Sequence, residues 1–320
     1  MISNLSDKKA VKMKNIFLII SAILLLNLTA CDYFEEGDTL DSSTIEFSIS
    51  SLPAIPDSMT FVAWFENENP AQAEPTIIFT GDAVNGTLNY KSETNLRTLQ
   101  TAQLFWITVE RKSLLDTLPP TTPANSRKIL GGRFFNAAVN LGLGENVFNF
   151  DNSSVVYNLL TPTDGSNSNE LSGIWFVDSV DQDITTGLDL PQLFGGWRYE
   201  GWVEVNGVLI STGRFSSIIG ADQRNIFGGS GSPLPFPGED FINDPSDPPL
   251  GLTFPIDLTG AKIFLSLVLN DGRNAGTQPG IVLFEGTVPT PAQSRVTYTL
   301  NNANPPLPVG NALIKVDLIQ

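Results

Sequence analysis

The sequence predicts an all-β protein made of two tandem β-sandwich domains of the immunoglobulin-like class. Short runs rich in Val, Ile, Phe, Trp, Tyr and Thr recur along the 320 residues, and clusters of Gly, Pro, Asn and Asp separate them. The 27 glycines and 22 prolines supply the turns that such a fold needs. The folded region shows no sustained helical spacing of apolar side chains. A sandwich or barrel of short strands is therefore the expected class.

Several segments fit the strand pattern clearly, because each combines β-branched and aromatic residues and is bounded by turn residues. In chain order they are Met59–Glu66, Leu104–Glu110, Val155–Leu159, Ile174–Val177, Trp197–Val205, Ile263–Leu269 and Arg295–Leu300.

Two of these strands match each other when the chain is aligned with itself. Trp64 meets Trp202 at an offset of 138 residues, and without a gap Phe61 meets Tyr199. Later matches follow in the same order in both halves: 102–105 with 261–264, 129–132 with 283–286, and 155–159 with 296–300. Because the offsets change while the order is kept, we expect two copies of one domain that differ in loop length.

The expected organisation has four parts. Residues 1–30 form a signal peptide, 31–43 an acidic flexible tether, 44–170 the first sandwich, and 171–320 the second, an internal repeat of the first. Each sandwich is close to the commonest domain size of about 100 to 150 residues, which is enough to bury a core of its own.

The N-terminus has the pattern of a secretion signal that is cut off. Lysines at positions 8, 9, 12 and 14 precede the apolar run Ile16–Leu28, which is shorter than the roughly 20 residues of a membrane-spanning helix. Translation from Met1 or from Met13 preserves this pattern. We therefore expect the chain to be exported.

The apolar run ends in Leu28, Thr29, Ala30 and Cys31, which is the single cysteine of the chain. This order resembles the lipobox of bacterial lipoproteins. The resemblance implies that the signal is cut after Ala30 and that the Cys31 thiol is acylated. An ordinary cleaved signal with a spare thiol is the alternative, although a signal peptidase needs no cysteine at the cut.

The segment behind the cysteine sets the expected location. Residues 32–43 are polar and acidic, and an acidic cluster at this place resembles the surface-export signal of some bacterial lipoproteins. In other lipoproteins an aspartate next to the cysteine, as in Asp32, means retention in the inner membrane. We expect a lipid anchor in the bacterial cell envelope, at the outer membrane or the cell surface, while the leaflet stays open.

The charge of the exported chain disfavours two kinds of binding. Without Asp7 and the four signal lysines, 18 − 4 = 14 basic residues face 34 − 1 = 33 acidic residues, a net charge of −19. This charge repels phosphate backbones and anionic headgroups, so neither nucleic-acid binding nor electrostatic docking to a membrane is expected. The acyl chains would provide the anchor.

One segment resembles a known extracytoplasmic domain. Tyr199–Gly207 and Ser211–Phe215 combine an aromatic residue three positions before Trp-Val, a turn glycine, and Gly-x-Phe at the end of the next strand. This order resembles the first hairpin of the C-terminal extracytoplasmic domain of anti-sigma-K factors. Gly207 suits the turn, and Gly213 would let Phe215 approach the partner strand.

The resemblance covers 190–288, and a weaker copy covers 52–134, where Glu110 occupies the position of a family glutamate. The family's Glu-Pro pair is replaced here by Leu269 and Asn270. Because no sigma-binding helical domain is recognised before the signal, the resemblance implies a fold and not an anti-sigma activity.

The amino-acid composition limits the catalytic mechanisms that this chain could use. The chain has no histidine. Ser-His-Asp and Cys-His nucleophile arrangements and a zinc site of His and Cys are therefore excluded, with Cys31 taken by lipid. Paired carboxylates remain, so we keep a carboxylate-based hydrolase as a minor alternative.

The carboxylates that stand out lie in a Gly- and Pro-rich loop. They are Glu239, Asp240, Asp244 and Asp247. Their oxygens suit Ca²⁺ or general acid–base chemistry. A solvated acidic loop is the simpler interpretation, so we expect these groups to stay ionised and hydrated, with no cofactor other than a possible Ca²⁺.

Tryptophans are the other candidates for binding. Strand alternation places Trp197 and Tyr199 on one face and Trp202, between Glu200 and Glu204, on the other. Trp202, and Trp64 in the first copy, would thus form either an exposed platform for sugar rings or for a partner, or a structural contact covered by a loop or by the sister domain. We favour the covered arrangement, because large aromatic rings contribute most to domain contacts.

Together these features predict a membrane-anchored bacterial lipoprotein that acts as a non-catalytic interaction or structural module in the cell envelope. A carbohydrate-binding accessory lipoprotein is the alternative. The partner would be an envelope protein or a glycan, in addition to the membrane through the lipid anchor.

Overall fold

A computed structural model describes residues 42–69, 71, 73–94, 102–117, 120–143, 150–165, 168–178, 183–193, 195–222, 224–246 and 250–317. The predicted signal peptide, the lipobox with Cys31 and nearly all of the tether lie outside the described residues. Those described are almost entirely β, as predicted, with one short α-helix, α3 (Lys112–Thr117), and the 3-10 turns η1 (Asn125–Arg127) and η3 (Glu170–Ser172).

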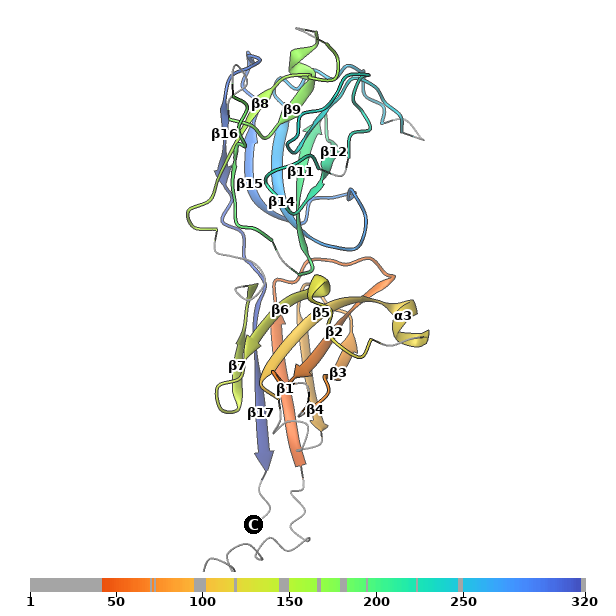
Figure 1. The fold of residues 1–320 in the computed structure, drawn as a ribbon, viewed down its shortest axis with the longest axis vertical. Coiled ribbons are helices and arrows are strands. Elements are labelled where there is room, and N and C mark those ends of the chain that lie inside the picture. Colours follow the sequence, from red (N-terminus) through yellow and green to blue (C-terminus); the bar gives the residue numbers. More distant parts are fainter. Residues whose placement is uncertain are drawn as a thin grey trace, which may run out of the picture. The chain divides into compact units, whose positions relative to one another are not determined.

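Residues Ser43–Lys315 form one compact unit in which the strands make three sheets (Figure 1). The first sheet has the order β4-β1-β17-β7, with β4 at Leu88–Thr94, β1 at Ser42–Ser50, β17 at Val309–Asp317 and β7 at Ala138–Leu141. A second sheet has the order β3-β2-β5-β6, with β3 at Thr76–Gly81, β2 at Met59–Glu66, β5 at Leu104–Arg111 and β6 at Lys128–Arg133. Phe47 of β1 and Phe105 of β5 stack edge to face between these two sheets, which form the first sandwich.

The third sheet has the order β12-β11-β14-β15-β16-β8-β9-β13, and β10 pairs with β8. Its strands are β8 (Ser154–Leu159), β9 (Gly173–Trp175), β10 (Leu188–Asp189), β11 (Trp197–Val205), β12 (Val208–Phe215), β13 (Gly238–Asp240), β14 (Lys262–Leu269), β15 (Ile281–Thr287) and β16 (Tyr298–Asn302). The sheet folds back on itself, because the ring of Phe176, just after β9, packs against Gly201 of β11.

The strands of the three sheets do not separate at the domain boundary that the sequence predicts between residues 170 and 171. The last strand, β17, lies between β1 and β7 and so completes a sheet of the first sandwich. Conversely, β8 belongs to the third sheet, where Tyr157 pairs with Tyr298 of β16. The proposed match of 155–159 with 296–300 is therefore wrong as an equivalence between two sandwiches, since these strands are neighbours in one sheet.

The internal repeat with an offset of 138 residues agrees with the pairing of the strands in the second and third sheets. The orders β3-β2-β5-β6 and β12-β11-β14-β15 correspond, and a bulge precedes Trp64 in one and Trp202 in the other. Trp64 pairs with Trp106, and Trp202 pairs with Phe264. Position 106 thus corresponds to 264, so the match of 105 with 264 is corrected by one residue.

The β11–β12 hairpin forms where the sequence predicted it. Asn206 and Gly207 both have positive φ values, 50° and 81°, as a two-residue turn between twisted strands requires. Tyr199 pairs with Phe215, and Trp197, Tyr199 and Val203 enter the main core. The opposite face of this hairpin carries the candidate site.

Candidate functional site

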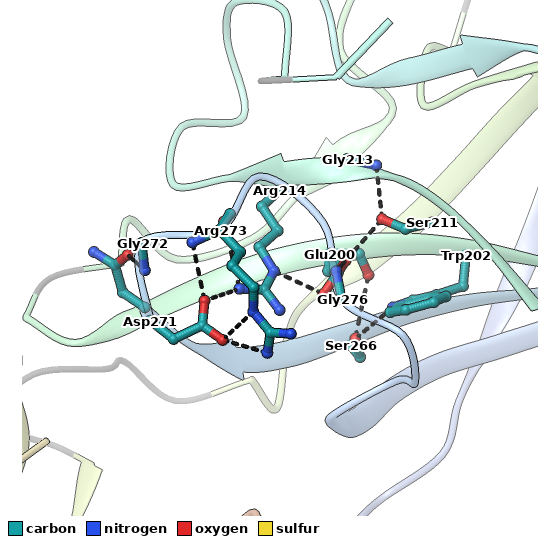
Figure 2. A network of polar contacts seen from close by, with 11 residues as sticks. Glu200, Trp202, Ser211, Gly213, Arg214, Ser266, Asp271, Gly272, Arg273 and Gly276 are labelled. Carbon is teal, nitrogen blue, oxygen red and sulfur yellow. Dashed lines mark hydrogen bonds and ion pairs between the residues drawn. The ribbon is translucent and has the colours of Figure 1, made fainter. Parts of the chain in front are cut away.

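The candidate site is a network of polar side chains on the outer face of β11, β12 and β14 (Figure 2). Glu200 of β11 is fully buried. Its Oε1 accepts hydrogen bonds from Ser211 Oγ at 2.7 Å and from Gly276 N, and its Oε2 accepts one from Arg214 Nε at 2.9 Å. Gly276 lies in the β14–β15 loop, so this loop closes over the carboxylate.

Arg214 links Glu200 to a second carboxylate. Its Nη1 donates to Asp271 Oδ1 at 2.6 Å, and the Arg273 side chain donates to Asp271 Oδ2 at 2.5 and 2.8 Å. Burial by itself would raise the pKa of Asp271, but the hydrogen bonds from Arg273 and the charge of Arg214 outweigh it and hold the pKa below its usual value. Two carboxylates thus meet two guanidinium groups, and the network is neutral.

The network borders a cavity of about 690 Å³ within the compact unit. Arg214, Asp271 and Arg273 line it together with the β14–β15 loop and the segment Ser51–Pro56. The Arg273 side chain is half exposed, whereas those of Arg214 and Asp271 are almost completely buried. The charged side chains that line the cavity therefore already neutralise one another.

The same face holds Trp202, which is 1% exposed and donates from Nε1 to Ser266 Oγ at 3.1 Å. Trp64 is also 1% exposed and donates from Nε1 to Thr108 Oγ1 at 3.0 Å. Neither indole presents a ring to solvent, so these residues do not form the exposed platform considered from the sequence. The arrangement agrees with the covered alternative.

The acidic loop differs from the sequence expectation. Glu239 and Asp240 are both fully buried, because Gly238–Asp240 forms β13 and pairs with β9. Asp240 Oδ2 accepts from Thr163 N at 2.8 Å and from its Oγ1 at 2.5 Å, while Oδ1 accepts from Trp175 Nε1 at 2.7 Å. The expectation of hydrated carboxylates is therefore wrong for this pair.

Burial also changes the protonation of the buried acids. It raises the pKa of Glu239 to about 8, that of Asp222 to about 7, and that of Asp240 above its ordinary value. Among the described residues, Glu239 Oε2 accepts only from Ile226 N at 3.1 Å, and Oε1 has no hydrogen-bond partner. At neutral pH Glu239 is therefore mostly protonated.

Asp222 was missed by the sequence reasoning. Its Oδ1 accepts from Arg224 N at 2.8 Å and its Oδ2 from Gly238 N at 3.0 Å, which ties the β12–β13 loop to β13. A Cβ on Gly213 would lie 2.5 Å from Asp222 Oδ1. The glycine in β12, which the sequence did show, therefore makes room for this carboxylate.

The remaining acidic candidates do not join Glu239 and Asp240 in a metal site. Asp244 accepts from Ser246 N and Leu250 N and so closes a turn, and Asp247 lies outside the described residues. Where the structure describes the chain, no three acidic or cysteine side chains group as metal ligands. Glu110, which the resemblance set opposite a family glutamate, is buried and pairs with Arg127. Thr60 pairs with Glu110 and Arg198 with Val268, so Glu110 corresponds to Val268 and not to Leu269.

Comparisons of the chain with protein-family models, with curated proteins and with solved structures found no match. The resemblances to the lipobox and to the anti-sigma-K domain therefore remain predictions from the residues. None of the helices within the described ranges is long and apolar enough to cross a membrane.

Proposed function

We propose that the mature chain is a lipoprotein of the bacterial cell envelope, anchored by acylated Cys31, that acts as a non-catalytic interaction or structural module. The lipobox order Leu28 to Cys31 and the acidic segment behind it support the anchor. The all-β architecture of the described residues suits a module that presents rigid surfaces.

The non-catalytic proposal rests on the burial and the ion pairing of the carboxylates. A hydrolase of this composition needs two carboxyl groups that reach a substrate from an open cleft. Glu200 and Asp271 are instead held by arginines, and Glu239 and Asp240 are fully buried. The raised pKa of Glu239 would suit a general acid, but a group with no exposed surface cannot touch a substrate.

The burial of Trp64 and Trp202 is an argument against the carbohydrate-binding alternative. Sugar recognition by stacking requires an exposed ring face, and both indoles are covered. Binding of the purified chain to a glycan array, lost in Trp202→Ala but kept in a variant with a surface substitution, would support the carbohydrate-binding alternative instead.

Acylation is tested by Cys31→Ser in the full chain, with Ser21→Ala in the same signal as the matched control. We expect Cys31→Ser to lose fatty-acid labelling and either to enter the soluble exported fraction or to keep its signal. The control should remain labelled and membrane-bound. Unchanged labelling and detergent partitioning of Cys31→Ser would refute the anchor.

Catalysis is tested separately with the purified mature chain on glycan and peptide substrates. We expect no turnover. Hydrolysis that Glu239→Gln or Asp240→Asn abolishes, with both variants still folded, would overturn the non-enzyme proposal.

A further inference from the structure

The outer face of the first sheet carries an exposed apolar patch. Ala138 of β7 pairs with Leu313 of β17, and Phe135 forms a bridge with Ala138 across the turn of the β6–β7 hairpin. Residues directly paired in an antiparallel sheet point to the same side. Phe135, Ala138 and Leu313 therefore form one row, which we call the Phe135 patch.

The patch faces solvent and not the core. Phe135 is 83% exposed and Leu313 is 37% exposed, whereas the alternating residues Val139 and Ala312 are buried. Val309 is 53% exposed and precedes Leu313 by four residues on β17, so both side chains lie on the same side of the strand. Apolar side chains that gather on one exposed face mark a binding surface more often than scattered ones do.

Basic side chains lie beside the patch. Lys91 and Lys315 both pair with Glu46 on this side of the sheet, and the hydrogen bonds from Lys315 and then Lys91 lower the pKa of Glu46 to about 2. Two ammonium groups thus share one carboxylate, and Glu93, which lies on the same face of β4 as Lys91, balances the second positive charge. These four charges sum to zero, so the net charge of −19 of the mature chain does not oppose an apolar contact with a headgroup region at this place.

The chain itself limits how far this sheet can lie from the membrane. Only eleven residue steps separate Cys31 from Ser42, where β1 begins, and their full extension is at most about 40 Å. β1 lies beside β17 in the same sheet. The β3–β4 hairpin lies past the other end of β1, where Gly86 contacts the backbone of Leu52.

We propose that the Phe135 patch lies against the membrane that holds the acylated Cys31, with Phe135 and Leu313 entering the headgroup region. The proposal rests on the anchor described under the proposed function. The apolar contact would add a second attachment and would fix which side of the first sandwich faces the lipid.

The test uses depth-dependent quenching on vesicles of phosphatidylethanolamine and phosphatidylglycerol. The mature chain with Cys31→Ser is held through an N-terminal oligohistidine tag on nickel-chelating lipid, which is selective because the chain has no histidine. A bimane probe is placed on Phe135→Cys or Leu313→Cys, each then the only cysteine. Val84→Cys is the matched control, because Val84 is 72% exposed beside a two-residue hairpin turn of the same sandwich.

We expect nitroxide lipids to quench the probes at 135 and 313 and to leave the probe at 84 bright. Phe135→Asp, but not Val84→Asp, should lower vesicle partitioning of the untagged chain on the order of tenfold, as expected for loss of one buried phenyl ring. Equal quenching at 84 and 135, or none at 135, would overturn the proposal. The proposal would also be overturned if protection of the probe from solvent increased with protein concentration and did not depend on lipid. A second copy of the chain would then cover the patch. Because the tag replaces the acyl chain, failure of Cys31 acylation would not affect this result.

Discussion

The buried Glu239 predicts that the protein loses stability as the pH rises towards 8. In the folded chain burial raises the pKa of Glu239 from an ordinary 4.5 to about 8. Below the unfolded pKa the group is protonated in both states and costs nothing. Between the two values only the folded state keeps the proton, so the free energy of unfolding decreases with each pH unit.

The size of this effect follows from the two pKa values. At about 1.4 kcal/mol per pH unit, the interval between 4.5 and about 8 corresponds to about 5 kcal/mol lost from the free energy of unfolding, as an order of magnitude. Asp222 adds a loss of the same sign, because burial raises its pKa to about 7. The destabilisation from these two groups is thus nearly absent at about pH 4 and nearly complete at about pH 8.

Glu239→Gln isolates the contribution of this one group. Glutamine has nearly the shape of a protonated glutamate, and its Oε1 can accept the hydrogen bond from Ile226 N that now goes to Glu239 Oε2. We therefore expect the variant to match the wild type near pH 4 and to exceed it by several kcal/mol near pH 8. Urea denaturation across this pH range measures the difference, provided that the m-value stays constant.

Glu285→Gln, an exposed position on β15, is the matched control for the loss of one negative charge. Both variants remove one negative charge, so the self-repulsion of the chain's net charge changes equally in both. Because Glu285 is exposed, we expect its substitution to have a small effect on the free energy of unfolding at every pH. A difference between Glu239→Gln and the wild type that does not change with pH would refute the reasoning, as it would mean that Glu239 titrates alike in both states.

Three further substitutions test the packing, each measured as a change in the free energy of unfolding by urea. Arg214→Met should cost about 3 to 5 kcal/mol because it leaves Glu200 and Asp271 buried without their guanidinium, whereas Arg273→Met at the half-exposed position should cost about 1. Gly213→Ala should cost more than Gly220→Ala, since both have positive φ but only the first meets a carboxylate; equal losses would disprove that clash. Gly310→Val should cost about 2 kcal/mol or more because its Cβ would meet Ser48 O at 2.5 Å, and an effect no larger than that of exposed Asn311→Val would argue against the close β1–β17 contact.

Local sequence signals predicted several of the strands, because strand propensity and turn residues act over a few neighbours. The expected strand Arg295–Leu300 overlaps only the first half of β16. Met59–Glu66 and Trp197–Val205 form strands with the expected bounds. The one-residue error at 105 and 264 arose where Phe105, Trp106 and Ile107 are all apolar, so alternation could not set the register. Only the paired strand, through Trp64 and Trp106, fixes it.

The candidate site was only partly predictable, because burial depends on residues far away in the chain. Gly- and Pro-rich composition around Glu239 suggested a hydrated loop, yet pairing of Asp240 with Gly173 buries the pair. Strand alternation correctly placed Trp202 and Glu200 on one face, but the sequence of β11 alone could not predict that the β14–β15 loop covers Glu200 through Gly276. A glycine inside a strand, Gly213, was the available signal for Asp222.

Closure of the first sandwich by β17 has consequences for how the exported chain folds. The sheet that starts at Ser42 is completed by a strand that starts at Val309, so nearly the whole folded chain must be available before this sheet can form. Loop-closure entropy over so long a separation makes the pairing a late event. The third sheet contains strands only from β8 to β16 and has no such requirement. Folding of the intervening strands would shorten the effective loop and so bring β17 to β1. We therefore expect the third sheet to form before the first sheet is closed.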